Sequence, residues 1–436
     1  MKKTLLKSAL IITLDQEKPD YFYGDILINE DLIEEISEKP GEIDSESTDR
    51  VIDGSNLIVM PGLVNTHGHA AMSLLRSYAD DLPLKKWLEQ KIWPIEARLE
   101  SNDVYWGTML SIIEMIKGGT TTFTDMYYYM DRVAAAAAES GIRAVLSRGM
   151  IGLDFDLEKG FSDTRDFISS WHGAENDRIK VILGPHSAYA GASGFLKRVV
   201  NFAGKTGLPL QIHLAETKDE VDGCQAELGC SSTAMLADIG FFDFKVVAAH
   251  CVHLSDADIE ILAEKQVGVS HNPGSNLKLG SGIAPIKRLL DCGVKVGIGT
   301  DGAASNNNLD MIEEMRLAAL ISKGVALDPT VINAKTALLM AAPAGAEILG
   351  LENTGCLKAG YKADLIGLRR DRPHLTPLHD PLAHLVYASA AADVNLVMVD
   401  GRLLLQDGIL QTLDEEKIRA EAARCAERLV NAGKDK

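Results

Sequence analysis

The alternation of apolar and polar positions divides the chain into three regions. Residues 1–58 contain short β-rich runs separated by polar turns, and the same texture returns from residue 361 onward. Between these ends, apolar runs alternate with segments of helical period, which predicts parallel strands joined by crossover helices. The N-terminal run could pass for a signal peptide, but Lys7 interrupts it, Asp15 follows it and no small-residue cleavage site appears. We therefore interpret it as a first strand.

The central region contains eight runs of strand character, which is the number that a (β/α)8 barrel requires. The first begins at Val59, and the others span residues 120–125, 143–148, 179–184, 208–214, 245–250, 267–271 and 294–300. The pattern predicts an α/β fold, with a (β/α)8 TIM barrel over residues 59–360. Residues 1–58 and 361–412 are expected to form a small β-sandwich domain built from both chain ends, with Asp400-Gly401 as a hairpin turn. Residues 413–436 are expected to form a C-terminal helix.

The net charge and the cysteine content limit the partners and the cellular compartment that we expect for this protein. The net charge of −18 and the lack of a basic cluster argue against a nucleic-acid partner or an anionic membrane. The six cysteines include no C-x-x-C pair, which indicates reduced thiols and a cytoplasmic protein. No stretch of the sequence approaches the roughly 18 apolar residues that a membrane span requires.

Two histidines, His67 and His69, end the first apolar run of the central region. Side chains at i and i+2 of an extended strand point to the same side, so the two imidazoles can face one target. Imidazole suits a borderline metal such as zinc or ferrous iron. An isolated H-x-H is more often a surface or core pair, so a metal site depends on further ligands downstream.

Three later strands end in further polar groups of this kind. His213 ends the run 208–214, His250 ends the run 245–250, and Asp301 follows the run 294–300. Because catalytic groups of such barrels lie where strands end, these side chains are expected to converge. The prediction is a mononuclear metal site with an open position for water, whose ligands are His67, His69, His213 and Asp301.

Catalytic roles follow from the same arrangement. Asp301 can accept the proton of the metal-bound water, and Glu216, three residues after His213, can carry protons to the substrate. His250 is expected to hydrogen-bond the hydroxide or to bind the metal in some states. The fourth strand leads into Gly184-Pro185-His186 and offers no lysine, which argues against a carbamylated lysine that bridges two metals.

Longer stretches around these residues carry a family resemblance. The more specific ones are P-G-L-V-N-T-H-G-H-A-A-M-S-L-L-R-S-Y-A-D-D-L-P-L (61–84) and W-P-I-E-A-R-L (93–99). Others are E-M-I-K-G-G-T-T-T-F-T-D-M (114–126), G-P-H-S (184–187), I-H-L-A-E-T (212–217), A-A-H-C-V-H-L (248–254), S-H-N-P-G-S-N-L-K-L-G-S-G-I-A-P (270–285) and G-T-D-G-A-A-S-N-N (299–307). With these motifs the chain resembles the amidohydrolase superfamily and, more narrowly, the 5′-methylthioadenosine/S-adenosylhomocysteine deaminases.

The resemblance implies hydrolytic deamination at C6 of an adenosine-type purine, with one divalent metal ion per subunit. Zinc is the expected metal, with ferrous iron or manganese as alternatives, and a homo-oligomer is expected. By carry-over from the family, four residues are expected to meet the substrate: Glu96 at the ribose hydroxyls, Trp87 in the pocket wall, His186 near the substrate and Arg148 at the homocysteine carboxylate. A packed helical aromatic remains the alternative for Trp87, and a structural salt bridge remains the alternative for Arg148.

The chain departs from the family at a second arginine that usually follows Arg148. The corresponding stretch reads G-L-D-F-D-L-E-K-G-F-S-D-T-R-D (152–166), in which Lys159 and Arg165 are the candidates to replace it. With one arginine, recognition of an amino-acid carboxylate is weakened, and we expect 5′-methylthioadenosine to be at least as good a substrate as S-adenosylhomocysteine. A guanine, pterin or chloro-triazine hydrolase with the same metal site remains an alternative, as does a barrel that serves as a non-catalytic scaffold.

Overall fold

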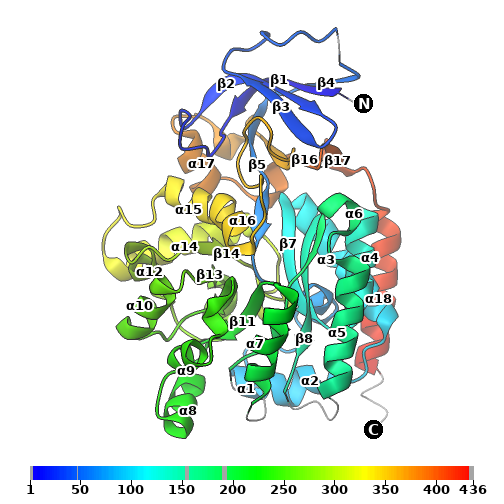
Figure 1. Cartoon of the computed structure of the whole chain (residues 1–436). Helices are drawn as coiled ribbons and strands as arrows, with labels where there is room; N and C mark the ends of the chain where they lie inside the picture. Colours follow the sequence, from blue (N-terminus) through cyan, green and yellow to red (C-terminus); the bar gives the residue numbers. More distant parts are fainter. Residues whose placement is uncertain (1–2, 47, 153–156, 189–193, 432–436) are drawn as a thin grey trace.

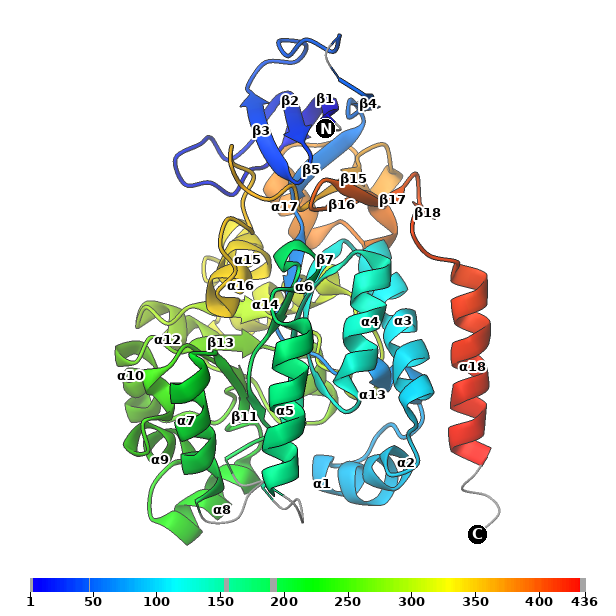
Figure 2. The same cartoon turned by 45° about the vertical axis from the view of Figure 1, so that its right-hand side comes forward.

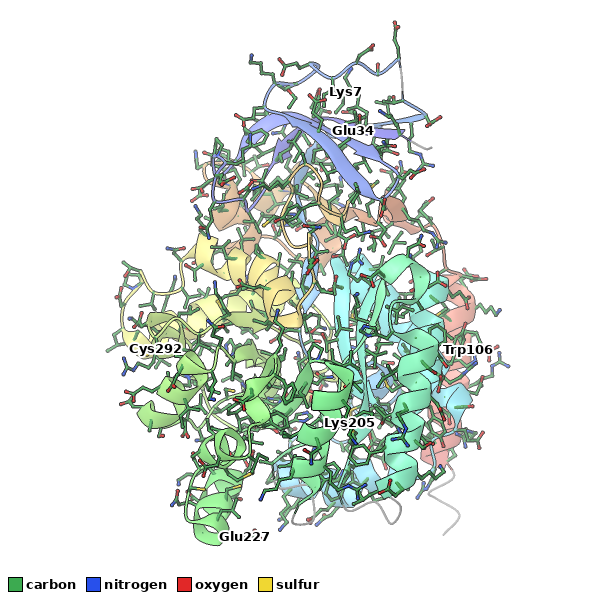
Figure 3. All side chains as sticks on the ribbon, in the orientation of Figure 1. Lys7, Glu34, Trp106, Lys205, Glu227 and Cys292 are labelled. Atoms are coloured by element: carbon green, nitrogen blue, oxygen red, sulfur yellow. The ribbon has the colours of Figure 1, made fainter. Side chains whose placement is uncertain are left out.

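The computed structural model describes residues 3–46, 48–152, 157–188 and 194–431. A barrel surrounded by helices forms the larger part of the molecule, and a sheet made from both chain ends covers one end of it (Figure 1). Figure 3 shows Glu227 at the end of the molecule opposite Lys7 and Glu34, which lie in the terminal sheet. Among the described residues, no helix is long and apolar enough to cross a membrane.

Eight strand positions form the barrel, and all pairings within it are parallel. In chain order they are β6 (Leu63–Asn65), β7 (Thr120–Tyr127), β8 (Arg143–Met150), β9 (Ile179–Val181) with β10 (Gly184–Pro185), β11 (Leu210–Leu214), β12 (Val246–His250), β13 (Gly268–His271) and β14 (Val296–Ile298). β14 pairs with β6, and bridges from Leu183 to Leu210 and from Ser187 to His213 join the fourth position to β11. The ring is therefore closed, which confirms the predicted barrel.

Helices follow the barrel strands and cover the outside of the ring (Figure 2). They include α3 (Ser101–Lys117), α4 (Met130–Ser140), α5 (Leu157–Trp171), α7 (Phe195–Thr206), α8 (Lys218–Leu228), α9 (Ser232–Asp238), α10 (Asp256–Glu264), α12 (Ile286–Asp291), α14 (Met311–Ala326), α15 (Ala334–Ala341), α16 (Pro343–Leu349) and α18 (Glu415–Asn431). α3 shows how the sequence defines such a helix: the Asp103 carboxylate accepts the Glu100 N–H at its start, and Gly118 ends it. α18 packs against α3.

Shorter helices lie mainly in the connections. They are η1 (Ala70–Leu75), α1 (Leu84–Trp87), the π-helix η2 (Leu88–Ile92), α2 (Trp93–Glu96), α6 (Ala174–Asp177), η3 (Phe241–Asp243), α11 (Pro273–Lys278), α13 (Ala303–Asn306), η4 (Pro373–Leu375), α17 (Pro381–Tyr387) and η5 (Ala391–Asp393). α1 and α2 lie at the end of the barrel away from the terminal sheet (Figure 2). This is the end at which the side chains of the predicted site are found.

The terminal sheet has nine strands drawn from both ends of the chain. They are β1 (Lys3–Ile11), β2 (Phe22–Asn29), β3 (Leu32–Ser37), β4 (Arg50–Asp53), β5 (Leu57–Pro61), β15 (Leu365–Arg369), β16 (Val394–Val399), β17 (Arg402–Gln406) and β18 (Ile409–Leu410). Side chains from both halves, among them Ile28 and Leu396, share one apolar core, as a small domain built from both chain ends requires. Asp400 and Gly401 both have positive φ in the hairpin between β16 and β17, as predicted.

The chain passes from the terminal sheet into the barrel at Gly62. Val59, predicted to begin the first barrel strand, lies in β5 of the terminal sheet, and the barrel begins at Leu63. A Cβ atom at Gly62 would lie 2.0 Å from Thr121 Oγ1, so only glycine allows this close crossing. The predicted domain boundaries at residues 58, 360 and 412 stay predictions.

A buried charge cluster joins the terminal sheet to the barrel. Arg143, the first residue of β8, places Nε 2.7 Å and Nη2 3.1 Å from the two carboxylate oxygens of Asp364, and it also pairs with Asp400. Because Arg143 opens its strand, the sheet covers the N-terminal end of the barrel. The C-terminal ends of the strands, where such barrels carry their active sites, are therefore left for function.

Candidate metal centre and active site

Polar side chains from four strand positions converge at the C-terminal end of the barrel. His67 and His69 follow β6, His213 lies in β11, His250 ends β12, and Asp301 follows β14. One ligand atom each from His67, His69 and His213 lie within 4.8 Å of one another, and the same holds for His67, His250 and Asp301. The strand ends thus meet as the sequence predicted.

Hydrogen bonds define the tautomers of two of these histidines. Nδ1 of His69 lies 2.7 Å from the carbonyl oxygen of Met126, and Nδ1 of His213 lies 2.6 Å from that of His186. A carbonyl oxygen only accepts, so both Nδ1 atoms carry hydrogen and both Nε2 atoms carry lone pairs. Those two Nε2 atoms are 3.3 Å apart. Two lone pairs at this separation repel unless a cation lies between them, and metal-bound histidines are oriented in this way.

His67 and Asp301 complete a set that fits a divalent ion. Nε2 of His67 is buried without a hydrogen-bond partner among the described residues. Oδ1 of Asp301 lies 3.6 Å from Nε2 of His67 and 3.3 Å from Nε2 of His69. The other oxygen, Oδ2, accepts hydrogen bonds from Ser275 Oγ at 2.6 Å and Ser305 Oγ at 2.7 Å. One oxygen is thereby held while the other faces the imidazoles, which gives the three-nitrogen, one-oxygen donor set of a catalytic zinc site.

Ionisation at the centre agrees with such a set. Burial lowers the pKa of His67 and of His213 well below the ordinary histidine value, so both rings are neutral and able to donate a lone pair. Burial tends to raise the pKa of Asp301, but the nearby His69 and His250 outweigh it and the pKa is lowered. The carboxylate is therefore ionised. An ionised carboxylate among neutral imidazoles is the charge state that a divalent cation requires.

His250 and Glu216 lie beside this set. Nδ1 of His250 donates to Oδ1 of Asn276 at 2.8 Å, which leaves Nε2 to face Glu216 Oε2 at 4.0 Å. Burial opposes a charge on His250, yet the carboxylates of Glu216 and Asp301 raise its pKa. Burial raises the pKa of Glu216, so this group retains a proton to higher pH than an ordinary glutamate.

Strained backbone supports these strand ends. His250 has φ 71°, Asp301 has φ 61° and Ala215, just before Glu216, has φ 51°. The left-handed region is costly for residues other than glycine, and such conformations concentrate where structure holds functional groups in place. The three residues are adjacent to the centre in sequence or belong to it.

Glu96 lies between Tyr127 and a cavity that it helps to line. It ends α2, and its Oε1 accepts a hydrogen bond from the Tyr127 hydroxyl at 2.6 Å. The Tyr127 ring lies 6.4 Å from the His69 ring, so Tyr127 links Glu96 to the centre. Burial raises the pKa of Glu96, and the hydrogen bond from Tyr127 opposes that shift. The cavity on the far side of Glu96 encloses about 940 Å³.

The structure locates the remaining predicted substrate contacts. Arg148 lines the same cavity as Glu96, as does Lys159, while Arg165 is exposed on α5 and is not among the described residues that line it. Nη2 of Arg148 lies 3.7 Å from Asp163 Oδ2. Residues 153–156, which precede α5 in the sequence, lie outside the described part of the chain.

His186 and Trp87 lie in different surroundings, the first beside a histidine of the centre and the second in the apolar core. The His186 ring stacks on His213 with centroids 4.5 Å apart, and burial lowers the pKa of His186 to about 4. Trp87 is 5% exposed within the main apolar core. The tryptophan of this segment that lines the cavity is Trp93, which is half exposed.

Two residues near the centre received no role from the sequence. Asp125 in β7 is fully buried, and its Oδ1 accepts the Ala70 N–H at 3.0 Å, directly after His69. Its Oδ2 has no partner among the described residues, and burial raises its pKa to about 7. Tyr127 is the second. Both lie near the end of a predicted strand, which is the signal that identified His213 and His250.

A closed parallel barrel with histidines and an aspartate at its C-terminal end defines the class of TIM-barrel proteins with a metal-binding centre. The model of the amidohydrolase family matches residues 58–404. Since that match spans most of the chain, this protein belongs to the amidohydrolase family.

Relatives and solved structures resemble the chain over nearly its whole length. A 5-methylthioadenosine/S-adenosylhomocysteine deaminase of Pelotomaculum thermopropionicum is 49% identical over 431 residues, which is 99% of this chain and 100% of the relative. A 5′-deoxyadenosine deaminase of Methanosarcina mazei is 48% identical over 433 residues, 99% of both chains. The crystal structure of an adenosine deaminase from Xanthomonas campestris with bound zinc has a TM-score of 0.93 at 32% identity and covers 99% of each chain.

An enzyme named for a different activity shares the fold. The zinc complex of an atrazine chlorohydrolase from Arthrobacter aurescens has a TM-score of 0.91 at 25% identity, and the match covers 97% of this chain and 100% of that structure. The overall fold is thus shared by solved structures whose named activities differ.

Proposed function

We propose that this chain is a metal-dependent aminohydrolase that deaminates 5′-methylthioadenosine, S-adenosylhomocysteine or related adenosines, giving the inosine-type product and ammonia. The observation that carries this proposal is 49% identity over 431 residues with a deaminase of that name, in a chain whose centre brings together His67, His69, His213, His250 and Asp301. The cavity beside Glu96 supports it further, because a nucleoside needs room beyond the purine for its ribose and 5′ group.

One divalent ion would be held by His67, His69, His213 and Asp301. We favour zinc, because the donor set suits it and the Xanthomonas campestris structure contains it, with iron and manganese as alternatives. When bound, such an ion lowers the pKa of its water to about 7 and supplies hydroxide near neutrality.

We assign the proton-transfer steps to Glu216 and Asp301. Burial raises the pKa of Glu216, which favours its protonated form, and we assign it the role of giving a proton to N1 of the purine as the nucleophile adds to C6. The pKa of Asp301 is lowered, so its ionised carboxylate can accept a proton of the attacking water and deliver it to the departing amine. The proton of the new C6 hydroxyl passes back to Glu216 as ammonia leaves, so C6 becomes the carbonyl of the 6-oxo product, N1 keeps its hydrogen and Glu216 is protonated again. His250 donates a hydrogen bond to the nucleophile through Nε2.

The nucleoside would extend from the centre past Glu96. Its ribose hydroxyls donate to the Glu96 carboxylate, which Tyr127 holds in place at 2.6 Å. His186 approaches the purine from its position against the His213 ring. Arg148 meets the 5′ group in the cavity, and Trp87 supports the wall from the core.

The test is an absorbance assay on zinc-loaded protein with adenosine, 5′-methylthioadenosine, S-adenosylhomocysteine, guanine and cytosine. We expect turnover of the adenosines and none of the two free bases. Turnover of guanine alone would replace the nucleoside assignment with the guanine, pterin or chloro-triazine alternative, which the likeness to the atrazine chlorohydrolase structure keeps in view. A protein that purifies without metal and recovers no activity with zinc or iron would instead be a scaffold. The proposed homo-oligomer is tested separately by light scattering.

A further inference from the structure

The cavity beyond Glu96 carries more negative than positive side chains. Among its described lining residues, four carboxylates stand against two cations: Glu96, Asp131, Asp163 and Asp166 against Arg148 and Lys159. If the purine lies at the metal centre and the ribose at Glu96, the 5′ substituent enters this space. The charged side chains of the cavity therefore attract or repel the 5′ substituent, which is the group that distinguishes one adenosine derivative from another.

Both cations of the cavity already face one carboxylate of the protein. Nη2 of Arg148 lies 3.7 Å from Asp163 Oδ2, and Nζ of Lys159 lies 3.4 Å from the same oxygen. A carboxylate on the substrate must share or displace these contacts, and it would approach Asp163 as a like charge. An arginine whose guanidinium N–H groups face no protein carboxylate can bind a substrate carboxylate through two parallel hydrogen bonds. The position of Asp163 beside Arg148 opposes that mode of binding.

We propose that the cavity prefers neutral or positively charged 5′ substituents over carboxylates, and that Asp163 is the residue that sets this preference. The substrate class is that of 5′-alkylthio and 5′-amino adenosines. This inference rests on the proposed nucleoside deamination. Because Arg148 and Asp163 are 29% and 37% exposed, solvent screens their pair, and the effect of Asp163 is about fivefold and no larger.

The experiment measures kcat/KM on four nucleosides that differ in 5′ charge: 5′-amino-5′-deoxyadenosine, 5′-methylthioadenosine, S-adenosylhomocysteine and adenosine-5′-carboxylic acid. The readout is the ratio of the value for the carboxylic acid to the value for 5′-methylthioadenosine. Since both values come from one preparation, a partly folded variant does not change the ratio. We expect the wild-type protein to favour the amine over the carboxylic acid by tenfold or more.

Three variants separate Asp163 from the general charge of the cavity. Asp163→Asn is expected to raise the ratio about fivefold. Asp166→Asn removes the same charge from the same cavity, but no described residue forms an ion pair with Asp166, so the ratio is expected to change less than twofold. In Arg148→Ala with Asp163→Asn the gain is expected to disappear, because the freed guanidinium is what binds the carboxylate.

Two results would overturn the inference: an equal rise in Asp163→Asn and Asp166→Asn, or a wild-type protein that prefers the carboxylic acid to the amine. Absence of turnover with all four nucleosides would overturn the proposed function itself, and the inference with it.

Discussion

The carboxylate of Glu220 accepts the backbone N–H groups of Ala215 at 3.1 Å and of Glu216 at 2.9 Å. It reaches back from the first turn of α8, where the Thr217 hydroxyl accepts the Glu220 N–H as the helix cap. These bonds hold the turn in which Ala215 has φ 51°. Glu220 therefore fixes the direction in which the Glu216 side chain leaves the backbone.

Glu220→Gln is expected to lower kcat about tenfold with little change in KM. The amide has one oxygen and cannot accept both N–H groups, so Glu216 loses its fixed orientation while the substrate contacts remain. Steady-state kinetics on metal-saturated protein measure this. Glu227→Gln, an exposed change on the same helix (Figure 3), is the matched control. If KM rose and kcat stayed unchanged, Glu220 would support the substrate pocket and would not orient the Glu216 side chain.

Glu216→Gln is expected to keep the bound metal and to lose a factor of about 10² to 10⁴ in kcat, which is the usual contribution of one positioned proton-transfer group. Metal analysis and turnover of the same preparation give both quantities. Unchanged turnover would remove Glu216 from the mechanism.

Removal of metal by chelation is expected to lower Tm by about 5 °C or more, and zinc is expected to restore it. Without a cation, the lone pairs of His69 and His213 face each other at 3.3 Å in a buried space. Calorimetry of the His213→Ala protein should show no response to zinc, whereas the exposed His379→Ala protein should respond as wild type does. An identical Tm with and without chelator would argue against a metal centre.

Glu96→Ala is expected to reduce kcat/KM for 5′-methylthioadenosine by tenfold or more, because the ribose loses hydrogen bonds to a charged group. Turnover of adenine as a free base, if measurable, should fall much less. Glu89→Ala, an exposed change in the neighbouring η2, is the control. Equal losses for nucleoside and base would show that Glu96 does not bind the ribose.

Stability is expected to fall with rising pH because of Glu314. This buried carboxyl group accepts the Gly274 N–H and the Asn306 amide, and burial raises its pKa to about 8 from the ordinary 4.5. The folded protein therefore binds the proton more tightly than the unfolded chain, so the free energy of unfolding declines as pH rises from the unfolded pKa to the folded one.

Glu314→Gln lacks this ionisation. Relative to wild type, the deficit in its free energy of unfolding is expected to decrease by on the order of 1–3 kcal/mol between about pH 5 and pH 8. Denaturant unfolding of the two zinc-saturated proteins measures the difference, with the exposed neighbour Glu313→Gln as control. A difference that is independent of pH would mean that Glu314 does not change its protonation over this range.

The convergence of the metal-site side chains could be predicted because it depends on local pattern. His213, His250 and Asp301 each follow an apolar run, and parallel strands bring such positions to one edge. The point at which the chain passes from the terminal sheet into the barrel, Gly62, could not be predicted from such a pattern. β5 and β6 form one apolar stretch in the sequence, and only the approach of Thr121 to Gly62 separates the two sheets.

Contacts that depend on side-chain direction were harder to predict. Trp87 and Trp93 are both aromatic positions in short helices, yet Trp87 is buried in the core and Trp93 is half exposed. The roles of Tyr127 and Glu220 depend on where a long side chain ends, which spacing does not reveal. The pairing of Arg148 with Asp163 joins a strand end to a helix across a loop, and no sequence rule sets that distance.

The seam between β5 and β15 has a consequence for how the protein is made. Pro61 pairs with Leu365, so the two strands are synthesised far apart in time. β5 pairs with β1 on one side, but until the C-terminal part has left the ribosome its other side remains an unpaired apolar edge, which is a template for aggregation. A chain truncated before β15 should therefore accumulate as insoluble protein even though every residue of the metal centre is present. Cellular yield of active protein then depends on the last strands to be translated.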